Sequence, residues 1–449
     1  MSEHFLPQGF RMLHDFKKQS FKRHLSAPGL LQNVYNTFKK IPDTREFTSN
    51  RTIPLTDHLM SGLAVFGLKC SSLLEFDEKR KEPPVKENLK NLYHVNTPPS
   101  DTYLRERLDE VDPKFLRPSF KKIFSLAQRG KVLEEFVYLS GHVLISGDGT
   151  GEFHSNNISC PCCCTKKSKD GVISYYHQMF GVCIVHPDKK NVIPLCPELI
   201  INQHDTEKND CERNACKRFL ENFRREHPHL KAILLEDGLG STAPNIRMIE
   251  EHNLKYILGA KPGDHQFLFD SIENSDETKY YECTTEDGVY HQFRYLKNTP
   301  LNKSNRDVKV NVIEYRCTDK KGKEKNFSWV TNISITEKNI LKIATAGRSR
   351  WKVENETFNT LKNLGYNFKH SYGHGKQYLS TIFCMLLMLA FLIDQIQELC
   401  CPLFTRCKKA MRTYRELWET MRSFFRFFCF QDWEHFYRSI LKEVPLNTS

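Results

Sequence analysis

The chain has 449 residues, enough for about two to four domains, so a single small module is excluded. Hydrophobic residues make up 39% of the chain and charged residues 27%, and this much apolar material excludes wholesale disorder. The 66 Lys and Arg against 54 Asp and Glu give a net charge of +12. Such a charge favours a polyanionic partner, nucleic acid or an acidic membrane surface, without choosing between them.

Residues 1–130 are predicted to be mainly helical. Residues 1–40 interleave basic and aromatic side chains. This pattern suits either a helical arm on a phosphate backbone or an amphipathic helical region whose aromatic side chains face a core. Helical signals continue over 54–129, and the charged stretch 77–87, which carries Pro83-Pro84, is expected to be a loop.

Residues 131–261 alternate strand and helix signals. Strands are predicted at 136–145, 175–185, 192–201, 232–235 and 256–260, and helices at 210–227 and 243–252. This order predicts an α/β fold with a mixed sheet and helices on its faces. Acidic residues follow two strands, with Asp148 expected at the end of the first and Asp237 at the end of the fourth. Asp210 and Glu212 open a helix, where the helix dipole favours negative charge.

The remainder divides into three parts. Residues 262–335 read as a β-rich insertion; Trp329 in its last strand could stack on a base, but core packing is favoured. Residues 336–400 are predicted helical. Their apolar run, 382–393, has twelve residues, fewer than the ~18–20 of a bilayer span, so we predict a buried helix and no membrane partner. Residues 401–449 are expected to form an aromatic, basic helical tail.

Cysteine placement indicates a reducing compartment. The chain has 16 Cys, which cluster at 160–164 and are otherwise scattered, unlike a disulfide framework, and no signal peptide opens it. We therefore expect a cytoplasmic protein. Cys160 and Cys163 have C-x-x-C spacing, and a structural zinc would need two further ligands from candidates such as Cys183, Cys196, His154 or His177. A single C-x-x-C favours reduced cysteines in a loop over zinc.

Three carboxylates are candidates for chemistry: Asp148, Asp237 and Glu354, the last on a helix after the insertion. If the sheet brings them together, they can hold two Mg²⁺ ions, because magnesium prefers hard oxygen ligands and a metal pair stabilises phosphoryl displacement. Mn²⁺ is a plausible substitute. Each residue alone is more simply a turn or helix-capping acid.

The motifs around these acids resemble those of the DDE transposases, specifically the insertion sequence 4 family with its RNase H-like catalytic core. The likeness rests on Gly147-Asp148-Gly149-Thr150, on Leu234-Leu235-Glu236-Asp237-Gly238 and on Arg350-Trp351-Lys352-Val353-Glu354, with a β-rich insertion before the last acid. It implies that Asp148, Asp237 and Glu354 are catalytic metal ligands. It also implies that Arg350, with Lys352 or Lys362, binds phosphate.

The sequence departs from that family's pattern at two positions. Gly347 stands where the signature has Tyr, and Lys362 is eight residues after Glu354, about 80° around an α-helix. Glu356 competes with Glu354 as third acid, and the Arg350 spacing favours Glu354.

The resemblance implies a cut-and-paste DNA transposase that cleaves transposon ends and joins them to target DNA, with residues 1–130 binding double-stranded DNA and a homodimer forming on it. A catalytically silent DNA-binding relative and a structure-selective nuclease on the same fold are the alternatives.

Overall fold

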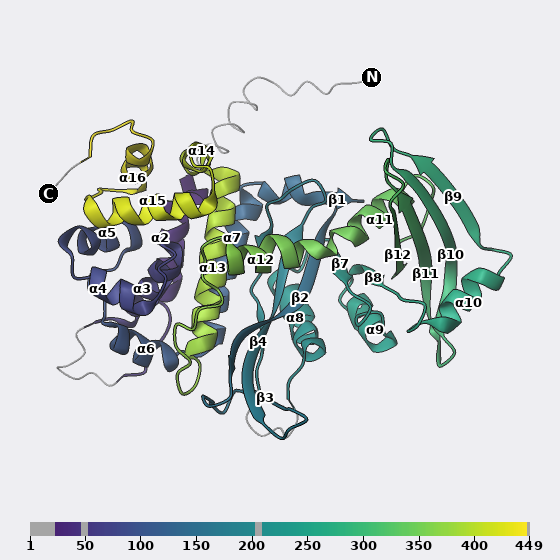
Figure 1. Cartoon of the computed structure of the whole chain (residues 1–449), viewed down its shortest axis with the longest axis horizontal. Helices are drawn as coiled ribbons and strands as arrows, with labels where there is room; N and C mark the ends of the chain where they lie inside the picture. Colours follow the sequence, from purple (N-terminus) through teal and green to yellow (C-terminus); the bar gives the residue numbers. More distant parts are fainter. Residues whose placement is uncertain (1–22, 46–52, 203–208, 447–449) are drawn as a thin grey trace.

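A computed structural model describes residues 23–45, 53–202 and 209–446. Figure 1 shows helices at one end, a sheet covered by helices in the middle, and a β-rich part at the other end. The C-terminal helices return to the N-terminal ones, and Asn88 of the helical part donates hydrogen bonds to the carbonyls of Phe425 and Phe428. The helical regions around Asn88 and Phe425, far apart in the sequence, therefore pack as one helical part.

Over the described residues, the N-terminal half of the helical part is built from six α-helices and short 3₁₀ turns. The helices are α2 (Ala27–Phe38), α3 (Leu55–Gly67), α4 (Leu73–Lys79), α5 (Pro83–Tyr93), α6 (Asp101–Asp109) and α7 (Arg117–Arg129), and the turns are Arg23–Leu25, Pro113–Leu116 and Val132–Phe136. The predicted loop over 77–87 is wrong. Pro83 and Pro84 occupy the first helical positions of α5, where the missing N–H costs nothing.

The basic and aromatic N-terminal stretch is described only in part, because residues 1–22 lie outside the described residues. In α2, Phe38 is fully buried, whereas Lys39 and Lys40 just beyond it are exposed. This part of the stretch is amphipathic, with its aromatic side toward a core.

The central sheet has the RNase H-like strand order, which confirms the predicted fold class. Its strands are β1 (Val137–Leu139), β2 (His142–Ser155), β3 (Cys164–Lys167), β4 (Ile173–Val185), β5 (Ile193–Pro194), β6 (Glu198–Ile200), β7 (Ala232–Glu236) and β8 (Lys255–Gly259). β4 pairs antiparallel with β2 on one side and with β3, β5 and β6 on the other, while β2, β7 and β8 are parallel. The helix α8 (Glu212–Glu226) leads from β6 into β7, and α9 (Ala243–Glu251) connects the parallel strands β7 and β8.

Two strand predictions need correction. β2 does not end at Gly147 but continues to Ser155, paired with β4. A Cβ on Gly147 would lie 2.4 Å from the Phe180 ring, so this glycine allows close packing within the strand rather than ending it. The predicted strand at 192–201 is broken into β5 and β6, which Pro194 and Pro197 separate because proline cannot donate to the ladder.

The β-rich insertion extends the central sheet. It comprises α10 (Gln266–Asn274), β9 (Lys279–Thr284), β10 (Tyr290–Asn302), β11 (Asn305–Thr318) and β12 (Glu324–Thr331). β12 pairs antiparallel with β8, so a single twisted surface runs from β3 to β9 (Figure 1). Trp329 is 5% exposed and stacks on Phe327 at a 4° angle, which confirms its packing role.

Helices complete the chain. They are α11 (Ile340–Arg348), a 3₁₀ turn (Ser349–Trp351), a π-helical turn (Val353–Phe358), α12 (Asn359–Asn363), α13 (Leu379–Cys400), α14 (Pro402–Ala410), α15 (Tyr414–Phe427) and α16 (Trp433–Ile440). Among the described residues, α13 is the one helix long and apolar enough to cross a membrane, and its most apolar window is 94% buried. This confirms the predicted buried helix, which lies between the helical part and the central sheet (Figure 1).

Candidate functional site

β2 and β7 bring Asp148 and Asp237 level with each other. Ser146 of β2 is in register with Leu235 of β7, and each aspartate follows two residues later, where the parallel pairing has ended. The strands separate there, and Asp148 is half-buried while Asp237 is exposed. The two aspartates therefore lie at the C-terminal edge of the parallel strands, where the sheet opens to solvent.

The helical segment that carries Glu354 lies directly on β2 and β4. The Ser146 hydroxyl donates to the Arg350 carbonyl at 2.8 Å, and the Cys183 sulfur lies 3.1 Å from the Thr357 hydroxyl. A Cβ on Gly181 would lie 2.7 Å from the Phe358 ring, so glycine is required for this close approach. Glu354 stands on the π-helical turn, an irregularity frequent at functional sites.

Arg350 links two of the predicted acids. Its Nη2 lies 2.7 Å from Glu354 Oε1, one helical turn along, and its Nη1 lies 3.5 Å from Asp148 Oδ2. Asp148 and Glu354 are 206 residues apart in the sequence but lie on either side of one guanidinium. The structure thus brings Asp148, Arg350 and Glu354 together.

Glu212 adds a fourth carboxylate. A Cβ on Gly149 would lie 2.6 Å from Glu212 Oε2, which places this side chain beside Asp148. Burial, followed by the negative charges of Asp237 and Glu236, raises the pKa of Glu212. Sequence reasoning assigned Glu212 to helix electrostatics, and its position at the start of α8 was the only signal available.

Crowding of like charges is strongest at Asp148. Burial, then the Glu354 carboxyl and the charge of Glu212, raise the pKa of Asp148 to about 6, and Arg350 opposes this shift. We call Asp148, Glu212, Asp237, Arg350 and Glu354 the acidic pocket. Its oxygen donors and its excess of negative charge suit hard divalent cations.

Two hollows meet at the acidic pocket. One, of about 460 Å³, is lined by Asp148, Glu212, Asp237 and Arg350 together with residues of α8 and α9. The other, of about 930 Å³, shares Asp237 and Arg350 and runs along the insertion strands. Its lining adds the basic and aromatic side chains of Lys261, Tyr280, Phe293, Arg294, Tyr315, Arg316, Phe327, Trp329, Arg348 and Trp351. Positive and aromatic groups thus lie beside the carboxylates.

The two lysines predicted to bind phosphate do not join the acidic pocket. The Lys352 side chain is buried and its ammonium donates to the Lys189 carbonyl at 2.7 Å; burial lowers its pKa. Lys362 instead lines a separate hollow with Lys69, Arg415 and Arg422. Gly347, the departure from the family's Tyr, lies under Trp329, whose ring would be 2.6 Å from a Cβ there. The tryptophan leaves no room for a larger side chain.

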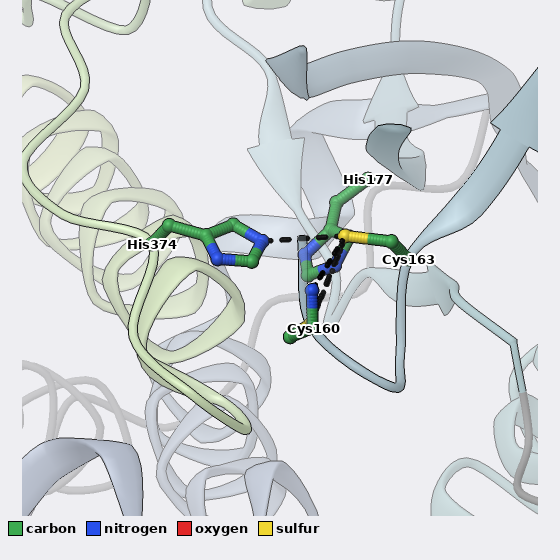
Figure 2. Close-up of side chains that lie close together, drawn as sticks. All are labelled: Cys160, Cys163, His177 and His374. Carbon is green, nitrogen blue, oxygen red and sulfur yellow. Dashed lines mark hydrogen bonds between the residues drawn. The ribbon is translucent and has the colours of Figure 1, made fainter. Parts of the chain in front are cut away.

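A second group of reactive side chains lies at the far end of β2 and β4 from the parallel strands. Cys160 and Cys163 meet His177 of β4 and His374 of the segment between α12 and α13 (Figure 2). We call these four residues the Cys/His cluster. His177 was among the candidates named from the sequence, but His374 was missed as a ligand, because 211 residues separate it from Cys163.

Comparison with known families bears on the acidic pocket. Residues 186–392 match the family described as "Transposase DDE domain". This segment is thus similar to transposase DDE domains. It contains Asp237, Arg350 and Glu354, and Asp148 precedes it, so the resemblance seen in the sequence motifs is confirmed.

Among solved structures, the chain is similar to a piggyBac transposase in a synaptic complex with hairpin DNA, studied by cryo-electron microscopy. The identity is 11% and the TM-score 0.42, with 95% of this chain and 82% of that chain covered. No curated protein matches the chain.

Proposed function

We propose that this protein is a DNA transposase of the cut-and-paste class, with Asp148, Asp237 and Glu354 as its catalytic metal ligands. The observation that carries the proposal is the approach of Asp148 and Glu354 to Arg350, together with the hollow that Asp148, Arg350 and Asp237 line. The similarity to transposase DDE domains supports it.

The donor set fits Mg²⁺, with Mn²⁺ as a substitute. The three ligands are carboxylates. Burial first, and then the neighbouring carboxyl groups of Glu354 and Glu212, raise the pKa of Asp148, and bound cations would relieve the crowding of these carboxylates. When bound, a pair of divalent ions activates the attacking oxygen and stabilises the leaving one.

Side chains around the acids would hold the DNA. Arg350 has five N–H donors and directs two contacts to carboxylates, which leaves donors for a phosphate oxygen. Basic side chains of the larger hollow would follow the DNA backbone, and exposed aromatic rings such as Trp351 would stack on bases.

The reaction proceeds by two in-line displacements. A water oxygen attacks the phosphorus at the transposon end, and the bond to the 3′ oxygen breaks, which frees a 3′-hydroxyl. That hydroxyl then attacks a phosphorus of target DNA, and the bond from this phosphorus to the 3′ oxygen of the target strand breaks. The transposon end is thereby joined to the 5′ phosphate of the target, and the displaced target strand ends in a free 3′-hydroxyl. No covalent bond to the protein is needed. Two ends require two active sites, so we propose a homodimer on double-stranded DNA, in the cytoplasm, with residues 1–130 contributing to DNA binding.

A strand-transfer assay with Mg²⁺ tests this proposal. The substrate is DNA carrying the inverted repeats that flank the gene in its native location. Joined products support transposition, cleavage without joining indicates a nuclease, and binding without either indicates a silent DNA-binding protein. Asp237→Asn should abolish both steps while DNA binding persists; undiminished joining by this variant would contradict the assignment.

A further inference from the structure

The Cys/His cluster has the dimensions of a tetrahedral zinc site. Zinc binds sulfur at about 2.3 Å and histidine nitrogen at about 2.0–2.1 Å, so a tetrahedron has S···S near 3.8 Å and S···N near 3.6 Å. The sulfurs of Cys160 and Cys163 are 3.8 Å apart. Nε2 of His177 lies 3.4 Å from the Cys160 sulfur and 3.3 Å from that of Cys163, and Nε2 of His374 lies 3.3 Å from the latter. All four ligand atoms lie within 4.8 Å of one another.

Both imidazoles are oriented as metal-bound histidines are. Each directs Nε2 into the cluster (Figure 2) and has an oxygen near Nδ1 on its other side. Nδ1 of His374 lies 3.0 Å from the Gly375 carbonyl, and Nδ1 of His177 lies 3.6 Å from Glu152 Oε1. Glu152 is thus placed as the carboxylate behind a metal-binding histidine.

Burial argues against a cluster of unliganded side chains. The side chain of His177 is 0% exposed and that of Glu152 is 3% exposed. Glu152 Oε1 and Nδ1 of His177 face each other at 3.6 Å, just beyond hydrogen-bond distance. A buried carboxylate is costly unless its charge is offset, and a cation bound to the histidine that it faces would offset it.

The backbone presents the ligands. The Cys163 N–H donates to the Cys160 carbonyl at 3.1 Å, and the Cys160 N–H lies 3.4 Å from the Cys163 sulfur, so the C-x-x-C segment is a tight turn. His374 stands between Gly373, with φ +137°, and Gly375, with φ +73°, values that favour glycine. Asp109 of α6 then accepts four consecutive backbone N–H bonds, from residues 376–379.

We propose that Cys160, Cys163, His177 and His374 bind a structural zinc ion. Four protein ligands leave no open coordination position, which is typical of a structural rather than a catalytic site. The ion would fasten the loop between β2 and β3 to the segment after α12, 211 residues later. Because Asp148 lies on β2 and Glu354 precedes that segment, zinc would hold together the two parts of the core that supply these acids. Zinc binding itself does not rest on the proposed function.

The test is the metal content and ligand environment of the full-length protein, purified without added metal chelators. We expect one zinc per chain by mass spectrometry of the metal, with X-ray absorption showing two sulfur and two nitrogen neighbours. Asp237→Asn should retain this zinc, which separates it from metal at the acidic pocket. Protein with free thiols that takes up no Zn²⁺ on titration, or one with a Cys160–Cys163 disulfide, would overturn the proposal.

Variants identify the ligands. Cys163→Ser should lose the zinc, whereas Cys164→Ser should keep it, because the Cys164 sulfur faces the Ile200 carbonyl and Asn202 instead. His374→Cys guards against simple misfolding, since it should retain zinc and raise the sulfur neighbours from two to three. If zinc in this variant keeps two sulfurs and two nitrogens, or Cys163→Ser keeps its full zinc, the assignment is wrong.

Discussion

The acidic pocket and the Cys/His cluster both draw on strand β2 yet differ in nearly every physical property. Each joins a residue of β2 or of the loop after it to a side chain that follows the β-rich insertion, Glu354 in one and His374 in the other. The acidic pocket is open: the Asp148 side chain is 28% exposed and that of Glu354 46% exposed, and two hollows reach it. The Cys/His cluster is closed around buried histidines.

The difference suits the open acidic pocket to chemistry and the closed Cys/His cluster to stabilising the fold. Hard oxygen donors at an open edge can exchange cations and admit a phosphate, but their mutual repulsion destabilises the fold. Sulfur and nitrogen donors in a closed site hold one ion permanently and exclude substrate. Strand β2 therefore contributes to the candidate functional site and, by our proposal, leads into the zinc site that holds the parts of the core together.

The largest expected effect is on catalysis. Glu354→Gln removes a negative charge from the acidic pocket, and we expect DNA cleavage to fall by on the order of 10³-fold. Glu356→Gln, two positions along the same turn, is the matched control and should stay close to the unaltered rate. Cleavage rates under single-turnover conditions with Mg²⁺ measure both. If the Glu356 variant loses activity and the Glu354 variant does not, the third acid is Glu356.

Next in size is the loss of the guanidinium in the acidic pocket. Arg350→Met should lower cleavage by about 10²-fold, since it removes the charge that faces both carboxylates and the proposed phosphate. Lys352→Met is the control, because its ammonium binds the Lys189 carbonyl, and a change of less than about threefold is expected. Equal losses in the two variants would return Lys352 to the phosphate-binding role that the sequence predicts.

A smaller effect is expected on metal affinity, and it distinguishes the Cys/His cluster from the acidic pocket. Glu152→Gln keeps the shape of the side chain behind His177 but removes its charge, and Zn²⁺ affinity should fall by about 10–100-fold. Glu212→Gln should leave Zn²⁺ affinity unchanged and alter only the Mg²⁺ dependence of cleavage. Competition with a zinc-binding dye measures the Zn²⁺ affinity. A Glu152 variant with unaltered Zn²⁺ affinity would show that this carboxylate does not support the histidine.

The residues of the acidic pocket could be predicted from the sequence more completely than those of the Cys/His cluster, for physical reasons. Asp237 follows a short apolar strand, and Arg350 and Glu354 are four residues apart on one helix face, so local pattern and spacing reveal them. The turn glycines around Asp148 suggested a strand end, because the packing of Phe180 on Gly147 is a tertiary contact. His374 lies in a glycine-rich segment with no local signal of metal binding, and only the folded chain brings it to Cys163. The placement of Lys352 could not be predicted either, since the Lys189 carbonyl that holds its ammonium belongs to a distant loop.

The smallest expected effect concerns the loss of stability in acid, to which a histidine outside both sites also contributes. Acid protonates the ligands of both sites, but His227, packed against Phe124 and Phe223, also responds. Burial, then nearby Lys121 and Arg117, lower the pKa of His227 to about 4 from its usual 6.5, so the folded protein binds fewer protons than the unfolded chain between these values. Stability is therefore complete above pH 6.5 and is lost as the pH falls toward 4. The shift corresponds to at most about 3 kcal/mol, reduced by solvent that reaches the half-buried ring.

His227→Phe keeps an aromatic ring and should flatten the pH dependence of stability, measured as the change in urea midpoint between pH 7 and pH 4.5. An unaltered pH dependence in the variant would assign the acid sensitivity to the metal ligands instead.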